Sequence, residues 1–514
     1  MPISPLGALN TTALIVPDLY VQIVPPSIAY LNGVPTNVLG VVGTASWGPV
    51  NAPTTIGSMA DYAREFGPIK ARANDLGTAV AAATLQGASN FRCVRVALNA
   101  VSASATIGTG TGAGIVLTGK HTGSLGNEIK ATISAGSKTS SWRLTVSLPG
   151  RSSEVFDNIE GTGTTVWDAM VAQVMLGNGS LRGPSELVSA AKPSTPGTAI
   201  VATAATALSG GSDGTASLVE SNFIGDDGDN RTGMYALRGT GCSVATLAEV
   251  TGSWPAQVAF GLSEGTYMVM AMPGGVSLPN ITTSVAAKAS AGVDHYTAKL
   301  MLGDWAYFSD TVNGQLRLIS PASFVAGKLV SLPPQHSTLN KQLYGVVGTQ
   351  RSAANRPYST AELQQLAEAG IDVVTNPVPG GNYFGCRIGH NTSSNTATNG
   401  DNYTRLTNYI ASTINAGMGR FIGRLQTPSE RREAKVTLES FLANMEQQGQ
   451  IGTANGDISY SVRLDDSNNP KSRVALGYQQ ADVKVIYLSI VEKFLVNVEG
   501  GQTVTVERIS TELA

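Results

Sequence analysis

The end of the chain carries a short strand-forming peptide, and this peptide limits how the fold can be completed. Residues 503–508 read Thr-Val-Thr-Val-Glu-Arg, a β-branched pattern that favours an extended strand, and Gly500 and Gly501 precede them. A single strand cannot satisfy its own backbone N–H and C=O groups. It must therefore pair with a sheet edge, either in its own fold or in a neighbouring subunit. We expect a protein that takes part in an assembly.

The first 26 residues have a similar pattern. Short β-branched runs occupy 12–16 and 20–24, with Pro17 between them and Pro25 and Pro26 after them. Both ends are therefore predicted to act as strand-donating arms, although pairing of the two ends inside one domain would satisfy the same backbone groups. The predicted inter-subunit residues are Leu14, Ile15, Val16, Val21, Ile23, Val504 and Val506, and the predicted hinge is Gly500 and Gly501.

The composition is that of a protein with much of its surface covered. The 514 residues suggest about three or four domains. Charged residues make up only 14% of the chain, compared with roughly 25% in an average soluble domain. We therefore expect extensive permanent interfaces. The net charge of -2 and the pI near 6.1 provide no basic surface for phosphate backbones, so no direct nucleic-acid binding is predicted.

The cysteines and the apolar runs indicate where the protein is found. Cys93, Cys242 and Cys386 are far apart and odd in number, so they predict reduced, mostly buried thiols rather than a disulfide framework. The first residues lack the cationic region of a signal peptide, and no uninterrupted apolar run reaches about 18 residues. We expect a protein made and kept in a cytosol, without membrane insertion.

The hydrophobic pattern predicts a multidomain α/β fold. Apolar runs at 38–43 and 91–96 flank two helix patterns, which begin at Ser58 and at Asn74 or Asp75, so a parallel sheet is expected. A Gly-, Ser- and Thr-rich region with short alternating runs then predicts an inserted β-rich domain. The predicted parts are an N-terminal arm (1–26), the first part of an α/β core (27–98), the inserted outer domain (99–207), the second part of the core (208–380), a C-terminal α/β domain (381–498) and a C-terminal arm (499–514).

Two later helices have clear start signals. Ser359 and Glu362 form a capping-box pattern for a helix that stops at Gly370, before a strand predicted at 371–374. Thr427 and Glu430 form a second capping-box pattern for a helix over about 428–448. Its polar side begins with Arg431, Arg432 and Lys435, which is typical either of a solvated face or of a patch that docks an acidic partner.

The sequence contains weak matches to catalytic patterns. Residues 210–214 and 261–265 fit the G-x-S-x-G pattern of a serine-hydrolase elbow, but neither follows an apolar strand, so Ser212 and Ser263 are expected in loops. The four histidines are scattered, and only Cys386 and His390 lie near each other. No catalytic residue, metal or cofactor is predicted. A cytosolic hydrolase that uses Ser212 or Ser263 remains the alternative from a different functional class.

Several separated segments resemble one known family. They are Leu39-Gly-Val-Val-Gly-Thr-Ala-Ser-Trp-Gly-Pro-Val-Asn51, Leu208-Ser-Gly-Gly-Ser-Asp-Gly214, Ser320-Pro-Ala-Ser323, Leu339-Asn-Lys341, Ala369-Gly-Ile-Asp372 and the helices of 401–449. Together they are similar to the sheath proteins of contractile phage tails and phage-tail-like particles. The pattern is spread over nearly the whole chain.

This resemblance implies a structural subunit rather than an enzyme. Subunits of the family stack as six-membered rings around a tail tube, and their contraction drives the tube through a bacterial envelope for genome delivery. The implied partners are further copies of the chain, the tube protein, and the baseplate and tail terminator proteins. The implied location is a virion tail assembled in the bacterial host cytoplasm. Arg431, Arg432 and Lys435 would then face the tube.

Two other structural roles fit the same sequence. One is the sheath of a tailocin or other contractile injection particle. The other is a capsid or surface-layer lattice protein, which would form shells or flat sheets instead of cylinders.

Overall fold

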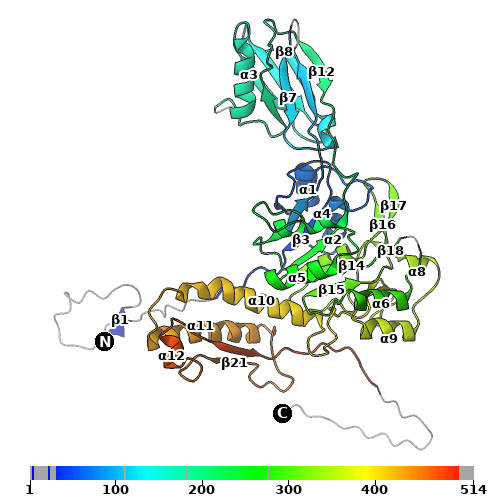
Figure 1. The fold of residues 1–514 in the computed structure, drawn as a ribbon, viewed down its shortest axis with the longest axis vertical. Coiled ribbons are helices and arrows are strands. Elements are labelled where there is room, and N and C mark those ends of the chain that lie inside the picture. Colours follow the sequence, from blue (N-terminus) through cyan, green and yellow to red (C-terminus); the bar gives the residue numbers. More distant parts are fainter. Residues whose placement is uncertain are drawn as a thin grey trace, which may run out of the picture.

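The computed structural model describes residues 3–4, 21–22, 31–108, 112–179, 182–275 and 277–496. The described chain is elongated and has three tiers, with a β-rich module at one end, an α/β core in the middle and a helical module beside and below the core (Figure 1). The predicted α/β class with several sheets is confirmed.

The core is built on a six-stranded sheet with the order β15-β14-β13-β3-β5-β4. All neighbouring strands are parallel except β4, which pairs with β5 in the antiparallel sense. The apolar runs in this sheet are buried on both faces, as expected for parallel strands covered by helices. The strands are β3 (Leu39–Gly43), β4 (Thr54–Ile56), β5 (Phe91–Arg95), β13 (Val244–Leu247), β14 (Tyr267–Ala271) and β15 (Ala298–Met301).

Helices cover both faces of this sheet because successive strand residues point to opposite sides. Val41 faces a core shared with α1 (Met59–Phe66), α2 (Leu76–Thr84) and α7 (Ala322–Ser331). Val42 faces a second core. The elements of this second side are α4 (Glu220–Ile224), η3 (Gly233–Leu237), α5 (Trp254–Glu264), α6 (Ile281–Ser290) and α9 (Thr360–Glu368). The predicted caps are present, since Ser58 and Asp75 accept backbone N–H groups at the starts of α1 and α2.

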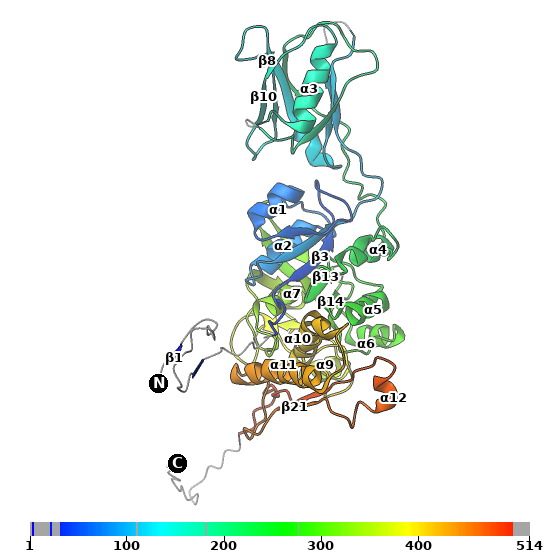
Figure 2. The same cartoon turned by 90° about the vertical axis from the view of Figure 1, so that its left-hand side faces the viewer.

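Residues 104–207 form the β-rich module, whose apolar side chains pack around Trp167, and Trp47 from the α/β core joins the same cluster. Figure 2 shows it standing apart from the core on two connecting segments. Its sheets have the orders β10-β9-β8-β12 and β11-β7-β6, with antiparallel pairing throughout. The elements are β6 (Ser104–Ile107), β7 (Ile115–Gly119), η2 (Ser124–Glu128), β8 (Lys130–Ala135), β9 (Trp142–Ser147), β10 (Glu154–Ile159), α3 (Thr165–Leu176), β11 (Val188–Ala191) and β12 (Thr203–Ala207).

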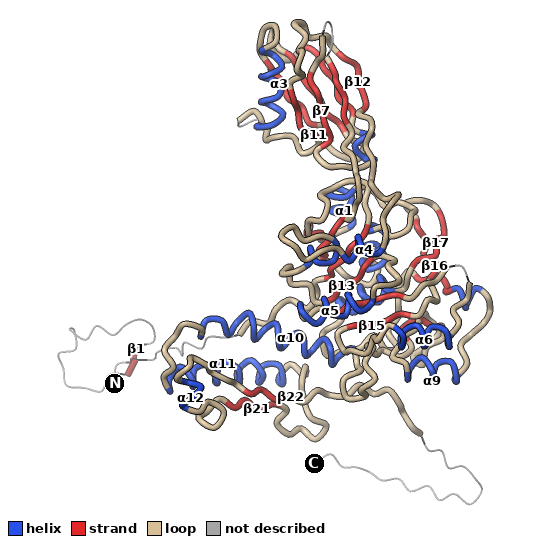
Figure 3. Tube along the Cα trace, viewed as in Figure 1, coloured by secondary structure: helices blue, strands red, loops and turns tan. Residues whose placement is uncertain are grey.

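The helical module packs two long helices, α10 (Asp401–Met418) and α11 (Pro428–Gln447), against a two-stranded sheet of β21 (Tyr460–Arg463) and β22 (Asp482–Val485) (Figure 3). Leu406, Leu438 and Val462 meet in its core. The remaining elements are β1 (Ile3–Ser4), β2 (Val21–Gln22), β16 (Ala306–Asp310), β17 (Gln315–Ile319), β18 (Val346–Thr349), α8 (Gln350–Ala353), β19 (Val374–Thr375), β20 (Gly385–Cys386), η4 (Gly419–Phe421) and α12 (Lys471–Val474).

Two local predictions are wrong in detail. The strand predicted at 371–374 makes only one bridge to β15, at Asp372, and regular pairing begins at Val374. The Asp372 carboxylate accepts the backbone N–H groups of Val373 and Ile388, which draws the chain away from the sheet ladder. The second capping box is incomplete, because the Glu430 carboxylate binds Arg424 at 3.0 Å instead of closing the box.

Candidate assembly interface

The sheet of β21 and β22 offers open edges for strand pairing. In the described part of the chain these two strands pair only with each other, over four residue pairs. One face is fixed to the module by Val462, which packs among the side chains of α10 and α11. A two-stranded sheet is marginally stable by itself, and its outer edges carry unpaired N–H and C=O groups. It is therefore suited to accept an extended peptide.

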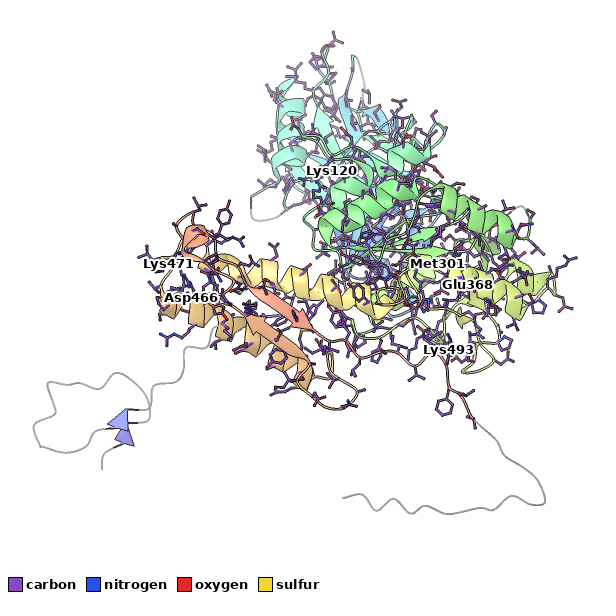
Figure 4. The ribbon with its side chains drawn as sticks, turned by 60° about the horizontal axis from the view of Figure 1, so that its bottom comes forward. Lys120, Met301, Glu368, Asp466, Lys471 and Lys493 are labelled. Carbon is purple, nitrogen blue, oxygen red and sulfur yellow. The ribbon has the colours of Figure 1, made fainter. Side chains whose placement is uncertain are left out.

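After β22 the chain runs on as an extended segment, 486–496, that exposes large apolar side chains. Val491 is 73% exposed, and Phe494 and Leu495 are each 85% exposed. Its first residues are held to the molecule, since Ile486 exchanges backbone hydrogen bonds with Ser459 and Gly452 and Tyr487 packs on the core of the helical module. Further along, Asn402 donates to the Leu488 carbonyl, and His390 Nε2 lies 2.7 Å from a Glu492 carboxylate oxygen. Figure 4 shows Lys493 on this segment, at the opposite end of the helical module from Asp466 and Lys471. Such a contiguous exposed apolar run is typical of a surface that a partner covers.

A second exposed apolar group lies at the other end of the helical module. Ile422 and Leu425, in the connection between α10 and α11, are 85% and 83% exposed. Leu476, after α12, is 75% exposed. The helical module thus has uncovered apolar side chains at both ends.

A buried ion cluster fixes the start of α10 to the core. The Lys299 ammonium, on β15, lies 2.6 Å from an Asp372 carboxylate oxygen and 3.0 Å from one of Asp401, and all three side chains are fully buried. Asp401 also accepts hydrogen bonds from Tyr267, Ser337 and Thr338. These contacts join β14, β15 and the segment before β18 to the first residue of α10.

The pKa values in the cluster show that its charged form is favoured. Burial by itself would lower the pKa of Lys299, but the carboxylates of Asp372 and Asp401 raise it above its usual value. Burial would likewise raise the pKa of Asp401, yet Lys299 and the hydrogen bonds of Thr338 hold it below the usual range. The start of α10 is consequently attached to the core by one ammonium that pairs with two carboxylates, and the carboxylate oxygens accept further hydrogen bonds from the core.

A second polar network attaches the β-rich module. The Arg95 guanidinium, buried at the end of β5, donates to the carbonyls of Gly48 and Thr122 at 2.8 and 2.7 Å. Arg72 lies 2.6 Å from Asp213, whose carboxylate also accepts the Ser124 N–H. Burial lowers the pKa of Arg95 to about 10, so this side chain keeps its charge at neutral pH. These hydrogen bonds and this ion pair therefore hold together the two segments that connect the core to the β-rich module, which we call the neck.

The three predicted tube-facing residues lie together at the start of α11 but bind within the chain. Arg431 lies 2.7 Å from Asp466, and its side chain is only 16% exposed. Lys435 lies 3.7 Å from Glu439, and Arg432 donates to the Pro428 carbonyl. Their contact with a tube stays a prediction.

Most of the predicted arm residues lie outside the described residues. This applies to Leu14, Ile15, Val16, Ile23, Val504 and Val506, and to the hinge pair Gly500 and Gly501. Val21 belongs to β2 and pairs in parallel with Ile3 of β1. The inter-subunit role of all these residues stays a prediction.

The two serine motifs have unsuitable surroundings for a nucleophile elbow. The prediction that Ser263 lies in a loop is wrong. It lies in the last turn of α5, where its hydroxyl donates to the Phe260 carbonyl. That motif runs from a helix into strand β14, which is the reverse of the strand-to-helix turn that an elbow needs. Ser212 lies in the segment returning from the β-rich module and pairs with Val101 through its backbone.

The cysteines are free and buried, as the sequence predicts. Burial raises the pKa of the Cys242 thiol to about 11, so this thiol is protonated at neutral pH. In the described ranges, no three His, Cys, Asp or Glu side chains are placed to hold a metal ion together. Nor does any helix in those ranges combine the length and the apolar character that crossing a membrane requires.

Comparison with known proteins places the fold. No protein-family model and no curated protein sequence matches the chain. Among solved structures, the sheath tail protein from Desulfitobacterium hafniense is 14% identical, with a TM-score of 0.57 over 87% of this chain and 93% of that chain. The fold is that of a tail sheath protein.

Two further sheath structures agree with this assignment. The sheath tail protein from Listeria innocua is 14% identical, with a TM-score of 0.58 over 84% of this chain and 89% of its own. The contracted PVC sheath of an extracellular contractile injection system is 11% identical, with a TM-score of 0.54 over 96% of this chain and 99% of its own. The sheath fold thus includes the core together with most of the flanking modules.

Proposed function

We propose that this chain is the structural subunit of a contractile phage tail sheath, which polymerises as stacked hexameric rings around a tail tube. The observation that carries the proposal is the extent of the sheath fold, since the match to the PVC sheath covers 96% of the chain. The low charge and the uncovered apolar segment 486–496 support a subunit that is buried in an assembly. No catalytic residue takes part in this function.

The proposed assembly uses the termini as strands shared between copies. The sheet of β21 and β22 has free edges, and the segment that follows it ends in strongly exposed residues, with Phe494 and Leu495 each 85% exposed. A terminal strand that pairs with this sheet in a neighbouring copy would add main-chain hydrogen bonds that survive a change in subunit orientation. The proposed hinge at Gly500 and Gly501 would absorb that change.

Contraction in this proposal is a transition between two lattices of rigid subunits. The buried cluster of Lys299, Asp372 and Asp401 and the neck around Arg95 favour motion of each subunit as one body. If the contracted lattice buries a further 500–1,000 Å² of apolar surface per subunit, the gross gain is roughly 12–25 kcal/mol at about 25 cal/mol per Å². A kinetic barrier would hold the extended lattice until it is triggered.

The proposed partners are the tail tube, baseplate and tail terminator proteins, and the proposed location is a virion tail built in the host cytoplasm. The β-rich module, with the limits 99–207, would face outward, and the module of 381–498 would face the tube. The sheath of an extracellular injection particle is the second candidate, favoured by the high coverage of the PVC sheath. Detection of packaged DNA in the native particle separates the two.

Negative-stain microscopy of the purified protein tests the proposal. Striated hollow cylinders are expected, whereas flat sheets or closed shells would favour a capsid or surface-layer lattice protein. Labelling of Ser212 or Ser263 by a fluorophosphonate probe would instead revive the hydrolase hypothesis.

A further inference from the structure

A cavity of about 370 Å³ lies where α8, the start of α9 and the segment after β19 come together. Three arginines line it: Arg351 and Arg356 come from one segment, and Arg387 comes from a later one. The lining residues used below are Arg351, Arg356, Arg387, Asn355, Tyr358 and Asn376.

The cavity has more positive charge than its surroundings neutralise. Arg351 lies 2.8 Å from Glu362 and stacks over the Tyr358 ring at 4.1 Å. Within the described ranges, no carboxylate pairs with Arg356 or Arg387. Two cationic side chains therefore remain available to an anion.

Buried polar atoms at this cavity also lack partners. Arg351 is only 9% exposed, and its Nη1 is buried with no hydrogen-bond acceptor in the described part of the chain. The Asn376 Oδ1 is also buried without a donor in the same part, but it is an acceptor, so a carboxylate cannot pair with it. A buried N–H group without an acceptor is unfavourable, so the Arg351 Nη1 indicates that a ligand with acceptor oxygens completes the site. Arginine forks suit carboxylates in particular, because they bind both oxygens.

The same chain exposes a loop with the matching charge. Residues 225–230 read Gly-Asp-Asp-Gly-Asp-Asn and connect α4 to η3. Asp227 pairs with Arg231 and Arg238. Asp226 and Asp229 are exposed, and neither has a cationic partner within the described residues.

The loop and the cavity of one molecule lie too far apart to meet. The loop leads into η3, which packs on β5. The cavity is instead lined by residues just after Asp372, and Asp372 forms a bridge with Met301 of β15. Four strand spacings separate β5 from β15 in the sheet, or roughly 19 Å at about 4.8 Å each. Any contact between them must therefore join two copies of the chain.

We propose that the acidic loop of one copy, through Asp226 and Asp229, docks at the arginine cavity of the next copy. This contact is heterologous, since it uses two different surfaces, and such contacts build rings or helices. The inference rests on the proposed sheath function and names one contact of that lattice. It is independent of the terminal arms.

Charge exchange tests the proposal. The basic variant Asp226→Lys with Asp229→Lys and the acidic variant Arg356→Glu with Arg387→Glu should each raise the critical concentration for cylinder formation at least about tenfold. The chain with all four substitutions should recover most of the loss. Lys138→Glu, an exposed reversal on the β-rich module, should leave assembly unchanged.

The outcomes separate this inference from the sheath proposal. If the unmodified protein forms no cylinders, the sheath function is wrong. If it does and the reversed variants assemble equally well, or the fourfold exchange restores nothing, the loop contact is wrong. Stabilisation of the isolated subunit by citrate or phosphate, lost in Arg356→Glu with Arg387→Glu and kept in the loop variant, would assign the cavity to a free anion and also overturn the contact.

A cross-link keeps the test decisive if a reversed variant does not fold. Asp229→Cys and Asn355→Cys are placed in separate chains, which are mixed during assembly and treated with a short bismaleimide. The native cysteines are buried, so background labelling is low. A dimer that needs both variants is expected, and its absence from well-formed cylinders would contradict the proposal.

Discussion

Replacing Lys299 with Met tests whether the buried cluster holds the helical module to the core. Met keeps most of the apolar stem of the side chain but removes the ammonium, which contacts Asp372, Asp401 and the His390 carbonyl at 2.6, 3.0 and 3.0 Å. Two fully buried carboxylates then lose the cation that forms an ion pair with both of them. The perturbation is therefore a charge deletion with little change in volume.

The expected loss follows from the burial. Breaking a buried ion pair by removing one partner destabilises proteins by about 3–5 kcal/mol, because the remaining charge is desolvated and uncompensated. The hydrogen bonds from Tyr267 and Thr338 to Asp401 remain and limit the loss. The matched control is Lys138→Met, since Lys138 is 66% exposed and pairs with Glu160 at 3.4 Å. That change should lower the free energy of unfolding by less than about 1 kcal/mol.

Urea unfolding followed by circular dichroism measures both variants, and hydrogen exchange at residues 401–406 shows whether α10 loosens first. The difference in the free energy of unfolding between the wild type and Lys299→Met should become smaller as the pH falls from 7 to 5. Without the cation, burial and mutual repulsion raise the carboxyl pKa values in the folded variant, so proton uptake favours its folded state. A loss no larger than that of Lys138→Met, or a gap independent of pH, would refute the reasoning.

Three further outcomes are expected. Deleting residues 500–514 should leave a soluble subunit that does not polymerise in sedimentation assays, and normal cylinders from the truncated chain would refute the arm hypothesis. Because the pKa of Asp401 is held low, its carboxylate stabilises the fold fully above about pH 4 and loses this effect below it. The melting-temperature gap to Asp401→Asn should therefore be constant from pH 8 to 5 and shrink below 4; a gap as large at pH 3 as at pH 7 would contradict this. Arg95→Met should lower the free energy of unfolding by about 2–4 kcal/mol, because buried carbonyls at the neck lose their donor, and should speed proteolysis between the core and the β-rich module. Equal protease resistance of the wild type and this variant would show that the neck does not depend on Arg95.

Local signals in the sequence predicted the regular elements of the core well. The apolar run before Gly43 is strand β3, and the caps at Ser58 and Asp75 start α1 and α2 as expected. These features succeed because each is decided by residues within one or two turns of each other. The resemblance to sheath proteins is confirmed at the level of the fold by structures that are only 10–14% identical.

The buried polar networks around Lys299 and Arg95 could not be predicted, because the residues that pair in them are far apart in sequence. Lys299 meets Asp372 and Asp401 across separations of 73 and 102 residues. The one local signal was a lysine inside an apolar strand, since a buried lysine needs a carboxylate partner. Glu430 shows the same limit on a smaller scale: the local pattern predicts a capping box, but Arg424 offers a stronger, charged partner.

The most direct test is a high-resolution map of the assembled protein. We expect hollow cylinders in which the terminal segments of each chain pair with β21 and β22 of another copy. Cylinders in which both ends fold back onto their own molecule, or a protein that remains monomeric at high concentration, would contradict the proposed sheath assembly.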